Sequence, residues 1–133
     1  MSVKQEYQQM DSIRQQKVAE MLKRNFSMVL AEEGKYIYGY SVMVSVTHVL
    51  ITPDLQLAKI YLSVFNTENK QEPLLEMEEN MPRLKQSLYA RIKKQMRVMP
   101  EIKFFLDDTI DEMYKVDALL KKMHDENQFG EES

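Results

Sequence analysis

Residues 74–99 read LLEMEENMPRLKQSLYARIKKQMRVM, and the other predicted elements are arranged around this stretch. Proline fits the first turn of a helix but disfavours helical geometry at the residue before it, so one helix should end and another begin at Pro82. The pattern predicts a short helix over residues 74–80 and a longer helix over residues 82–98. The kink between the two helices is predicted at Met81, Pro82, Arg83 and Leu84.

A β-hairpin is predicted upstream of this segment. Residues 42–52 and 58–65 are rich in β-branched side chains, which favour strands. Between them, Thr52-Pro53-Asp54-Leu55 has the composition of a tight turn with proline at its second position. The two strands should therefore pair with each other.

A long amphipathic helix is predicted before the hairpin. Ser12 followed by Gln15 has the spacing of a capping box, and apolar residues recur after it at helical intervals. The helix should run for about six turns. We expect it to end near Gly34, because glycine accepts the left-handed conformation common at helix C-termini.

One strand and one helix are predicted after the kinked segment. Pro100 ends the second helix, and residues 101–106 alternate apolar side chains in a way that predicts a third strand. Thr109 and Glu112 form another capping box at the start of a last helix. The order is α-β-β-α-α-β plus a C-terminal helix, which is an α+β fold with a three-stranded sheet and a helix-kink-helix unit.

Length and composition predict one domain. A chain of 133 residues, 44% of them hydrophobic, has apolar surface for a single core. We expect a flexible N-terminus over residues 1–10, the domain over residues 11–124 and an acidic flexible tail over residues 125–133. The chain has no cysteine, which suits the cytoplasm, and no segment approaches the roughly 20 apolar residues of a membrane span. We expect a soluble monomer with no membrane contact.

Charge is segregated along the chain, although the net charge is only −3. Residues 83–103 carry seven Lys or Arg and one Glu, a net of +6. On a helical wheel most of these cations lie opposite the apolar stripe, and without interspersed acids they repel one another unless a polyanion binds. This favours RNA binding over an ordinary solvated helix. The predicted RNA-binding residues here are Arg83, Arg91, Lys93, Lys94 and Arg97.

The first predicted helix adds three candidate RNA-binding residues, Arg14, Lys17 and Arg24. They lie roughly opposite its apolar face, but Glu20 interrupts the ridge, so this pattern alone is more typical of a solvated surface.

Tyr36, Tyr38 and Tyr40 would share one side of an extended segment and could stack on unpaired bases. Half-buried packing is the more common role of tyrosines that lead into a strand. We therefore favour packing for these three.

No catalytic, metal or cofactor site is predicted. The chain has three glycines, too few and too scattered for a phosphate-binding loop or for the GxxG loop of a standard KH domain. His48 has no cysteine or second histidine nearby, and His124 ends the last predicted helix, where the dipole favours a cation, so neither is predicted to bind a metal. Acidic residues at a helix start usually cap free backbone amides rather than hold magnesium. That reading covers Asp107, Asp108, Asp111 and Glu112.

The predicted order with its central kink is the type II KH arrangement, and over residues 12–123 the chain resembles the bacterial ribosome-binding factor A family. The resemblance rests on five motifs taken together. They are Arg14-Gln15-Gln16-Lys17-Val18, Val44-Ser45-Val46-Thr47-His48-Val49, Pro53-Asp54-Leu55-Gln56-Leu57-Ala58-Lys59-Ile60-Tyr61, Arg97-Val98-Met99-Pro100-Glu101-Ile102-Lys103-Phe104 and Asp107-Asp108.

The resemblance implies a non-enzymatic assembly factor that binds the immature 30S small ribosomal subunit and its 16S rRNA in late maturation and supports growth in the cold. It carries over Arg14, Lys17 and Arg97 as basic residues that contact phosphate. Where the family has an Ala-x-Gly kink, this chain reads Pro82-Arg83-Leu84. The alternative is a KH-like protein-interaction module whose basic helix docks an acidic partner protein. Neither function needs a small-molecule substrate.

Overall fold

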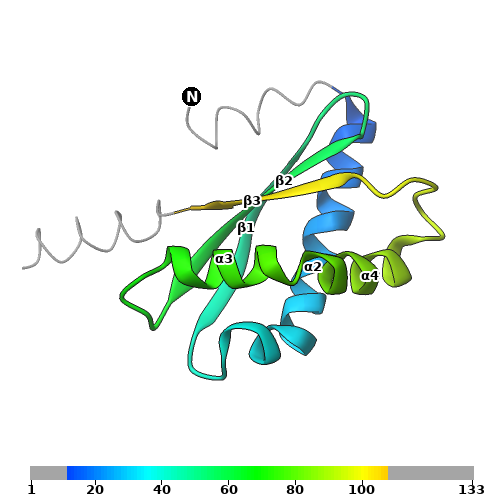
Figure 1. The fold of residues 1–133 in the computed structure, drawn as a ribbon. Coiled ribbons are helices and arrows are strands. Elements are labelled where there is room, and N and C mark those ends of the chain that lie inside the picture. The colour runs from blue at the N-terminus through cyan, green and yellow to red at the C-terminus, as the bar shows by residue number, and fades with distance from the viewer. Residues whose placement is uncertain (1–11, 108–133) are drawn as a thin grey trace, which may run out of the picture.

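The computed structural model describes residues 12–107, which form six helices and strands in the predicted order (Figure 1). The predicted C-terminal helix, the N-terminus and the acidic tail lie outside the described residues. The elements are α2 (Ile13–Tyr38), β1 (Met43–Ile51), β2 (Leu57–Phe65), α3 (Gln71–Glu79), α4 (Met81–Ile92) and β3 (Glu101–Leu106).

The three strands form one sheet in the order β1-β2-β3. β1 and β2 are antiparallel and are joined by the predicted turn, in which the Leu55 amide donates to the Thr52 carbonyl at 2.8 Å. β2 and β3 are parallel, from Leu57 opposite Glu101 to Leu62 opposite Leu106. Parallel neighbours need a long crossover, and α3 and α4 supply it. The hairpin and third-strand predictions are confirmed.

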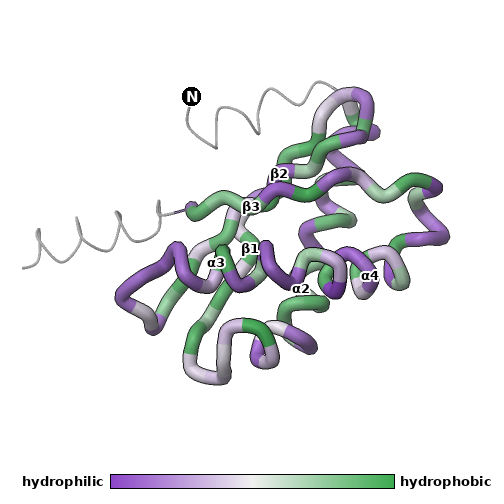
Figure 2. The backbone as a smooth tube through the Cα atoms, viewed as in Figure 1, coloured by the Kyte–Doolittle hydropathy of each residue, from purple (hydrophilic) through white to green (hydrophobic). Residues whose placement is uncertain are grey.

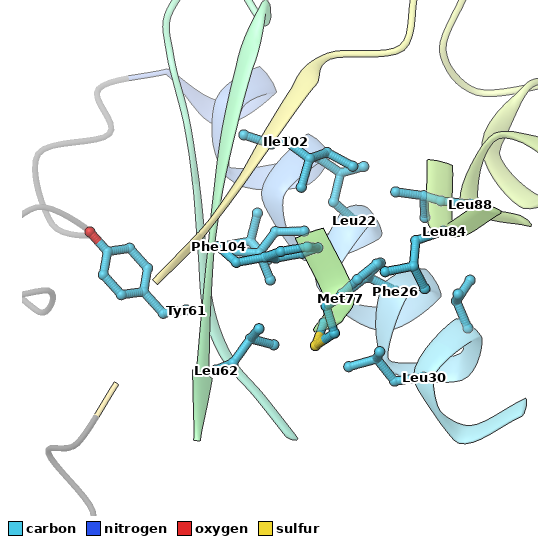
Figure 3. Packing of buried hydrophobic residues seen from close by; sticks show 14 of the residues in the cluster. Leu22, Phe26, Leu30, Tyr61, Leu62, Met77, Leu84, Leu88, Ile102 and Phe104 are labelled. Atoms are coloured by element: carbon cyan, nitrogen blue, oxygen red, sulfur yellow. The ribbon is translucent and has the colours of Figure 1, made fainter. Parts of the chain in front are cut away.

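The helices pack on one face of the sheet, and the core lies between the two layers (Figure 3). Leu22 and Phe26 of α2 are fully buried there, and the Phe26 ring stacks on Phe104 of β3 with centroids 5.6 Å apart. Tyr61 points away from this core, and its ring stacks on Phe105 at 5.2 Å (Figure 3). One face of the sheet is thus covered by the helices.

The first helix is longer than predicted, because Gly34 does not end it. α2 continues to Tyr38 and ends at Gly39, whose φ of 95° is left-handed. Gly34 is needed for packing instead: a Cβ there would lie 2.0 Å from the Tyr38 hydroxyl oxygen. The extended tyrosine segment is therefore wrong, since Tyr36 and Tyr38 are helical.

The break between α3 and α4 falls at Asn80, one residue before the predicted kink at Met81, Pro82, Arg83 and Leu84. The Asn80 amide donates to carbonyls of α3, and its own carbonyl accepts from the Leu84 amide at 3.1 Å. Asn80 therefore ends one helix and caps the next. Pro82 lies in the first turn of α4, where a missing amide proton costs nothing.

The second helix of the pair is shorter than predicted. α4 ends at Ile92, where the Lys93 amide still bonds to the Tyr89 carbonyl but the Gln95 amide turns back to Ile92. The chain must next reach β3, whose first residue is tied by its Glu101 amide to the Gln56 carbonyl at 2.7 Å. Unwinding at Ile92 leaves eight residues, 93–100, for that crossing. Lys93, Lys94 and Arg97 therefore do not lie on the predicted helical stripe.

Candidate nucleic-acid interface

The two predicted RNA-binding arginines of α4 face α2 and are paired there. Arg83 Nε donates to Glu33 Oε1 at 3.2 Å, and its guanidinium lies 5.6 Å from the centroid of the Tyr36 ring. Arg91 Nη1 lies 3.5 Å from Glu32 Oε1, and Nη2 donates to Met28 Sδ at 2.8 Å. Both ion pairs connect α4 to α2, and they leave 46% of the Arg83 side chain and 27% of the Arg91 side chain exposed.

The other six predicted RNA-binding residues are all exposed: Arg14, Lys17, Arg24, Lys93, Lys94 and Arg97, hereafter the open cations. Within residues 12–107, no acidic side chain forms an ion pair with any of them. Three lie on α2 and three lie in the segment between α4 and β3, where hydrophilic and hydrophobic residues alternate (Figure 2). The described part of the molecule therefore has two kinds of cation, paired and open.

Arg14 and Arg97 line one hollow of about 490 Å³, together with residues of the β1–β2 turn. Two hydrogen bonds fix this end of the molecule. Gln15 Nε2, buried in α2, donates to the Ile51 carbonyl at 3.0 Å, and the Glu101 amide donates to the Gln56 carbonyl. The start of α2, the turn and the start of β3 are thus held side by side, as Figure 1 shows.

The capping box that sequence predicted is what orients Arg14. The Gln15 amide donates to the Ser12 hydroxyl at 3.0 Å, and the Ser12 amide donates to Gln15 Oε1 at 3.3 Å. Gln15 therefore both closes the helix start and anchors it to β1. With α2 fixed in this way, Arg14 and Lys17 project from its first turns and stay exposed.

Asp54 lies in the same hollow but is held by the turn. Its Oδ1 accepts from the Thr52 hydroxyl at 2.6 Å and from the Gln56 amide at 3.1 Å. The hydrogen bond from Thr52, followed by that from Gln56, lowers the pKa of Asp54 below its ordinary value. Asp54 Oδ1 is thus hydrogen-bonded within the turn, and among the described residues Asp54 forms no ion pair with Arg14 or Arg97.

At the other end of α2, Tyr36 and Tyr40 lie in a different environment from Tyr38. Tyr36 and Tyr40 are exposed, by 61% and 81%, with the Lys35 ammonium 5.2 Å and 5.9 Å from their ring centroids. Tyr38 is half-buried against Gly34, and this burial raises the pKa of its hydroxyl. Tyr38 therefore packs as favoured from sequence, whereas the packing role predicted for Tyr36 and Tyr40 is wrong, because both are exposed.

His48 and Asp107 come together at a β-bulge in β1, a contact that sequence did not show. The Thr47 hydroxyl donates to Asp107 Oδ2 at 2.6 Å, and His48 Nε2 lies 3.8 Å from the same oxygen. Asp107 is buried and ties the end of β3 to β1. Among the described residues no group of three or more His, Cys, Asp or Glu could hold a metal. Asp108, Asp111, Glu112 and His124 lie outside those residues.

Comparison with known proteins settles the family. A family model described as ribosome-binding factor A matches residues 14–120. The chain belongs to the ribosome-binding factor A family. A ribosome-binding factor A of Cytophaga hutchinsonii is 39% identical over 114 residues, covering 86% of this chain and 85% of the relative. Its counterpart in Flavobacterium johnsoniae is 32% identical and covers 84% and 85%.

Solved structures show the same fold. The crystal structure of ribosome-binding factor A from Thermus thermophilus aligns with a TM-score of 0.56 at 22% identity, over 69% of this chain and 94% of that one. A model of the Thermus thermophilus factor, fitted into a cryo-electron microscopy map of its complex with the 30S subunit, aligns with a TM-score of 0.51 at 23% identity. It covers 65% of this chain and 92% of that one. The KH-like α+β prediction is confirmed.

None of the helices within residues 12–107 combines the length and the apolar character that a membrane span requires.

It was not predicted from the sequence that Arg14 and Arg97 lie beside a common hollow. Leu55, Gln56, Gln95 and Val98 also line it, and they come from two segments some forty residues apart. The turn motif at residues 52–55 and the family motif that begins at Arg97 each marked one of these segments. Nothing in their spacing indicated that the segments meet.

Proposed function

We propose that this chain binds the immature 30S subunit through its 16S rRNA during late maturation, as a non-enzymatic assembly factor of the cytoplasm. The observation that carries the proposal is the set of open cations, which have no acidic partner within the described residues. Membership of the ribosome-binding factor A family supports it, as does the 30S complex of the Thermus thermophilus factor.

The open cations contact phosphate in this proposal. Lysine and arginine bound to phosphates release condensed counterions, which supplies affinity without reading the base sequence. The shape of the folded rRNA then determines where the protein settles. Arg83 and Arg91 are left out of the interface, because Glu33, Glu32 and Met28 already hold them.

The test is co-sedimentation of the full chain with purified immature 30S subunits. Lys94→Glu combined with Arg97→Glu reverses two exposed charges outside any helix or strand, so the fold should survive while association weakens. The matched comparison uses neutral variants: Lys94→Gln with Arg97→Gln removes two charges from open positions, and Arg83→Gln with Arg91→Gln removes two charges from paired positions. If these two neutral double variants bind equally well, the assignment of the interface to the open cations is wrong.

A protein-interaction module would give a different pattern. If the open cations docked an acidic protein, the chain would bind that protein without rRNA and would ignore protein-free 16S rRNA fragments. Phosphate contact predicts binding to such fragments, with a log-log salt slope of about −0.7 to −0.9 for each neutralised charge. Binding that is indifferent to salt would argue against rRNA as the ligand.

A further inference from the structure

The hollow between α2, the β1–β2 turn and the segment after α4 has two chemically different walls. The guanidinium groups of Arg14 and Arg97 are exposed and open to an anion. Leu55 and Val98 supply apolar surface, and Val98 is 74% exposed although its side chain is β-branched and apolar. Its volume of about 490 Å³ falls within the range of about 300–1,000 Å³ typical of small-molecule sites.

Leu55 is held in a conformation that leucine avoids. Its φ is 61°, in the left-handed region where residues other than glycine and asparagine are strained. Hydrogen bonds around it keep it there: its amide donates to the Thr52 carbonyl at 2.8 Å, and Asp54 closes the turn on either side. Leu55 is half-buried: part of its side chain packs against the hydrophobic core, and it also lines the hollow.

We propose that this hollow takes a single unpaired nucleobase of the RNA, with the adjoining phosphates on Arg14 and Arg97. This rests on the proposed function and names the ligand of one part of that surface. A nucleotide combines a flat, largely apolar base with an anionic phosphate, which matches the two walls. An unpaired base can be splayed out of the stack for such a pocket, whereas a paired one must first give up its base pair at a cost in free energy.

The remaining polar groups of the hollow suit the edge of a base. Gln56 and Gln95 carry side-chain amides, which can both donate and accept hydrogen bonds. The Asp54 carboxylate accepts hydrogen bonds only, and it adds an acceptor for an exocyclic amino group. A nucleobase can donate a hydrogen bond from an exocyclic amino group to Asp54 while its phosphates lie on Arg14 and Arg97, whereas the carboxylate of an acidic peptide has no such donor.

The test uses three RNA hairpins of one sequence: one with a single bulged 2-aminopurine, one with an abasic residue at the bulge, and one fully paired. Affinity is measured by anisotropy of an end label, and burial of the base by 2-aminopurine fluorescence. For the unmodified chain we expect the bulged hairpin to bind roughly tenfold more tightly than the abasic one, equivalent to about 1.4 kcal/mol. The 2-aminopurine fluorescence should change on binding.

Variants then assign the effect to the hollow. Leu55→Gly suits a φ of 61° and should fold, yet the ratio of bulged to abasic affinity should fall toward one. Val98→Ser should lower the ratio as well, and Leu55→Met should restore it. Leu75→Ser is the matched control, because Leu75 is 57% exposed but lies on α3 and does not line the hollow.

Two failures are distinguishable. Equal affinity for the bulged and abasic hairpins, with salt-dependent binding to both, would overturn the base pocket and leave phosphate contact by the open cations standing. Failure to bind any hairpin or 30S subunit would overturn the proposed function instead. A ratio that persists in Leu55→Gly and Val98→Ser would place the base elsewhere on the molecule and also overturn the pocket.

Discussion

The arginines of α4 and the open cations carry the same charge in two different surroundings. Arg83 and Arg91 lie against α2, where Arg83 donates to Glu33, Arg91 forms an ion pair with Glu32, and part of each side chain is covered. The open cations project from the first half of α2 and from the segment between α4 and β3, where no acid of the described chain reaches them. Charge counted along the sequence does not separate these two groups. The packing of α4 against α2 does.

A basic segment can therefore serve two purposes within a few residues. A paired arginine at a helix interface stabilises the fold modestly, because its charge is screened and its partner must be desolvated. An unpaired lysine or arginine on the surface repels its neighbours until an anion arrives. Substitutions in the two groups should therefore have different effects, on RNA affinity for the open cations and on stability for the paired arginines.

The largest effect is expected from neutralising four of the open cations. Arg14→Gln, Lys17→Gln, Lys94→Gln and Arg97→Gln together should reduce affinity for a 16S rRNA fragment by roughly 10²–10³-fold near 0.1 M salt. The log-log salt slope should become shallower by about 3, since each contact contributes about 0.7–0.9. Filter binding across a salt series measures both quantities. An unchanged slope would mean that these residues do not meet phosphate.

A smaller effect, on stability and not on binding, is expected from the paired group. Arg83→Ala leaves Glu33 half-buried with no cation, and the Oε2 atom of Glu33 is already buried without a hydrogen-bond partner. We expect a loss of about 1 kcal/mol in the free energy of unfolding. Urea denaturation measures it, with Lys94→Ala as the control that should stay within about 0.5 kcal/mol of the unmodified chain. Equal losses of unfolding free energy in Arg83→Ala and Lys94→Ala would show that the paired arginine stabilises the fold no more than an open cation does.

Removing the acidic partners of Arg83 and Arg91 should make these two arginines behave like the open cations. Glu32→Gln with Glu33→Gln weakens the hold on Arg91 and Arg83, and affinity for the rRNA fragment should rise by roughly three- to tenfold. Any loss of two negative charges favours RNA to some extent. The control is therefore Glu78→Gln with Glu79→Gln, the same charge change at exposed positions of α3. If both double variants gain equally, long-range charge alone explains the gain.

Much of the fold could be predicted from the sequence, because local signals and long-range packing agree. Ser12 and Gln15 form the capping box that their spacing indicates, and residues 101–106 form the predicted third strand, with Ile102 and Phe104 buried. The turn chemistry of Thr52-Pro53-Asp54-Leu55 gives the hairpin its register. In each case the residues that specify the structure are neighbours in the chain.

The candidate site was less predictable, because its geometry depends on contacts between distant residues. Residues 93–98 continue a good helical pattern, yet the chain leaves the helix at Ile92 so that Glu101 can pair beside Gln56. This tertiary demand moved Lys94 and Arg97 off α4. The partner of Arg83 is Glu33, fifty positions away, and no spacing rule connects the two. Helical-wheel reasoning treats one helix at a time and cannot find such pairs.

The smallest effect concerns Asp54, the acidic residue that shares the hollow with Arg14 and Arg97. The hydrogen bond from Thr52, with that from the Gln56 amide, holds the pKa of Asp54 below its ordinary value of 3.8. A carboxyl group whose folded pKa is lowered stabilises the protein above its unfolded pKa, and this contribution is lost as pH falls through the folded pKa. The stabilisation is thus fully present at neutral pH.

Thr52→Val removes the hydroxyl that donates to Asp54 Oδ1, so the pKa of Asp54 should rise toward 3.8, while Thr52→Ser should keep it low. NMR titration of the Asp54 carboxyl carbon measures the shift. At neutral pH the valine variant should also be slightly less stable than the serine variant, and the difference should shrink below pH 3.8 as the carboxylate is protonated. A pKa that stays low in Thr52→Val would show that the Thr52 hydroxyl is not its main cause, and that the Gln56 amide or the nearby cations Arg14 and Arg97 hold the carboxylate. If the cations were the cause, Asp54 would partly neutralise them, and the contrast with the paired arginines would weaken.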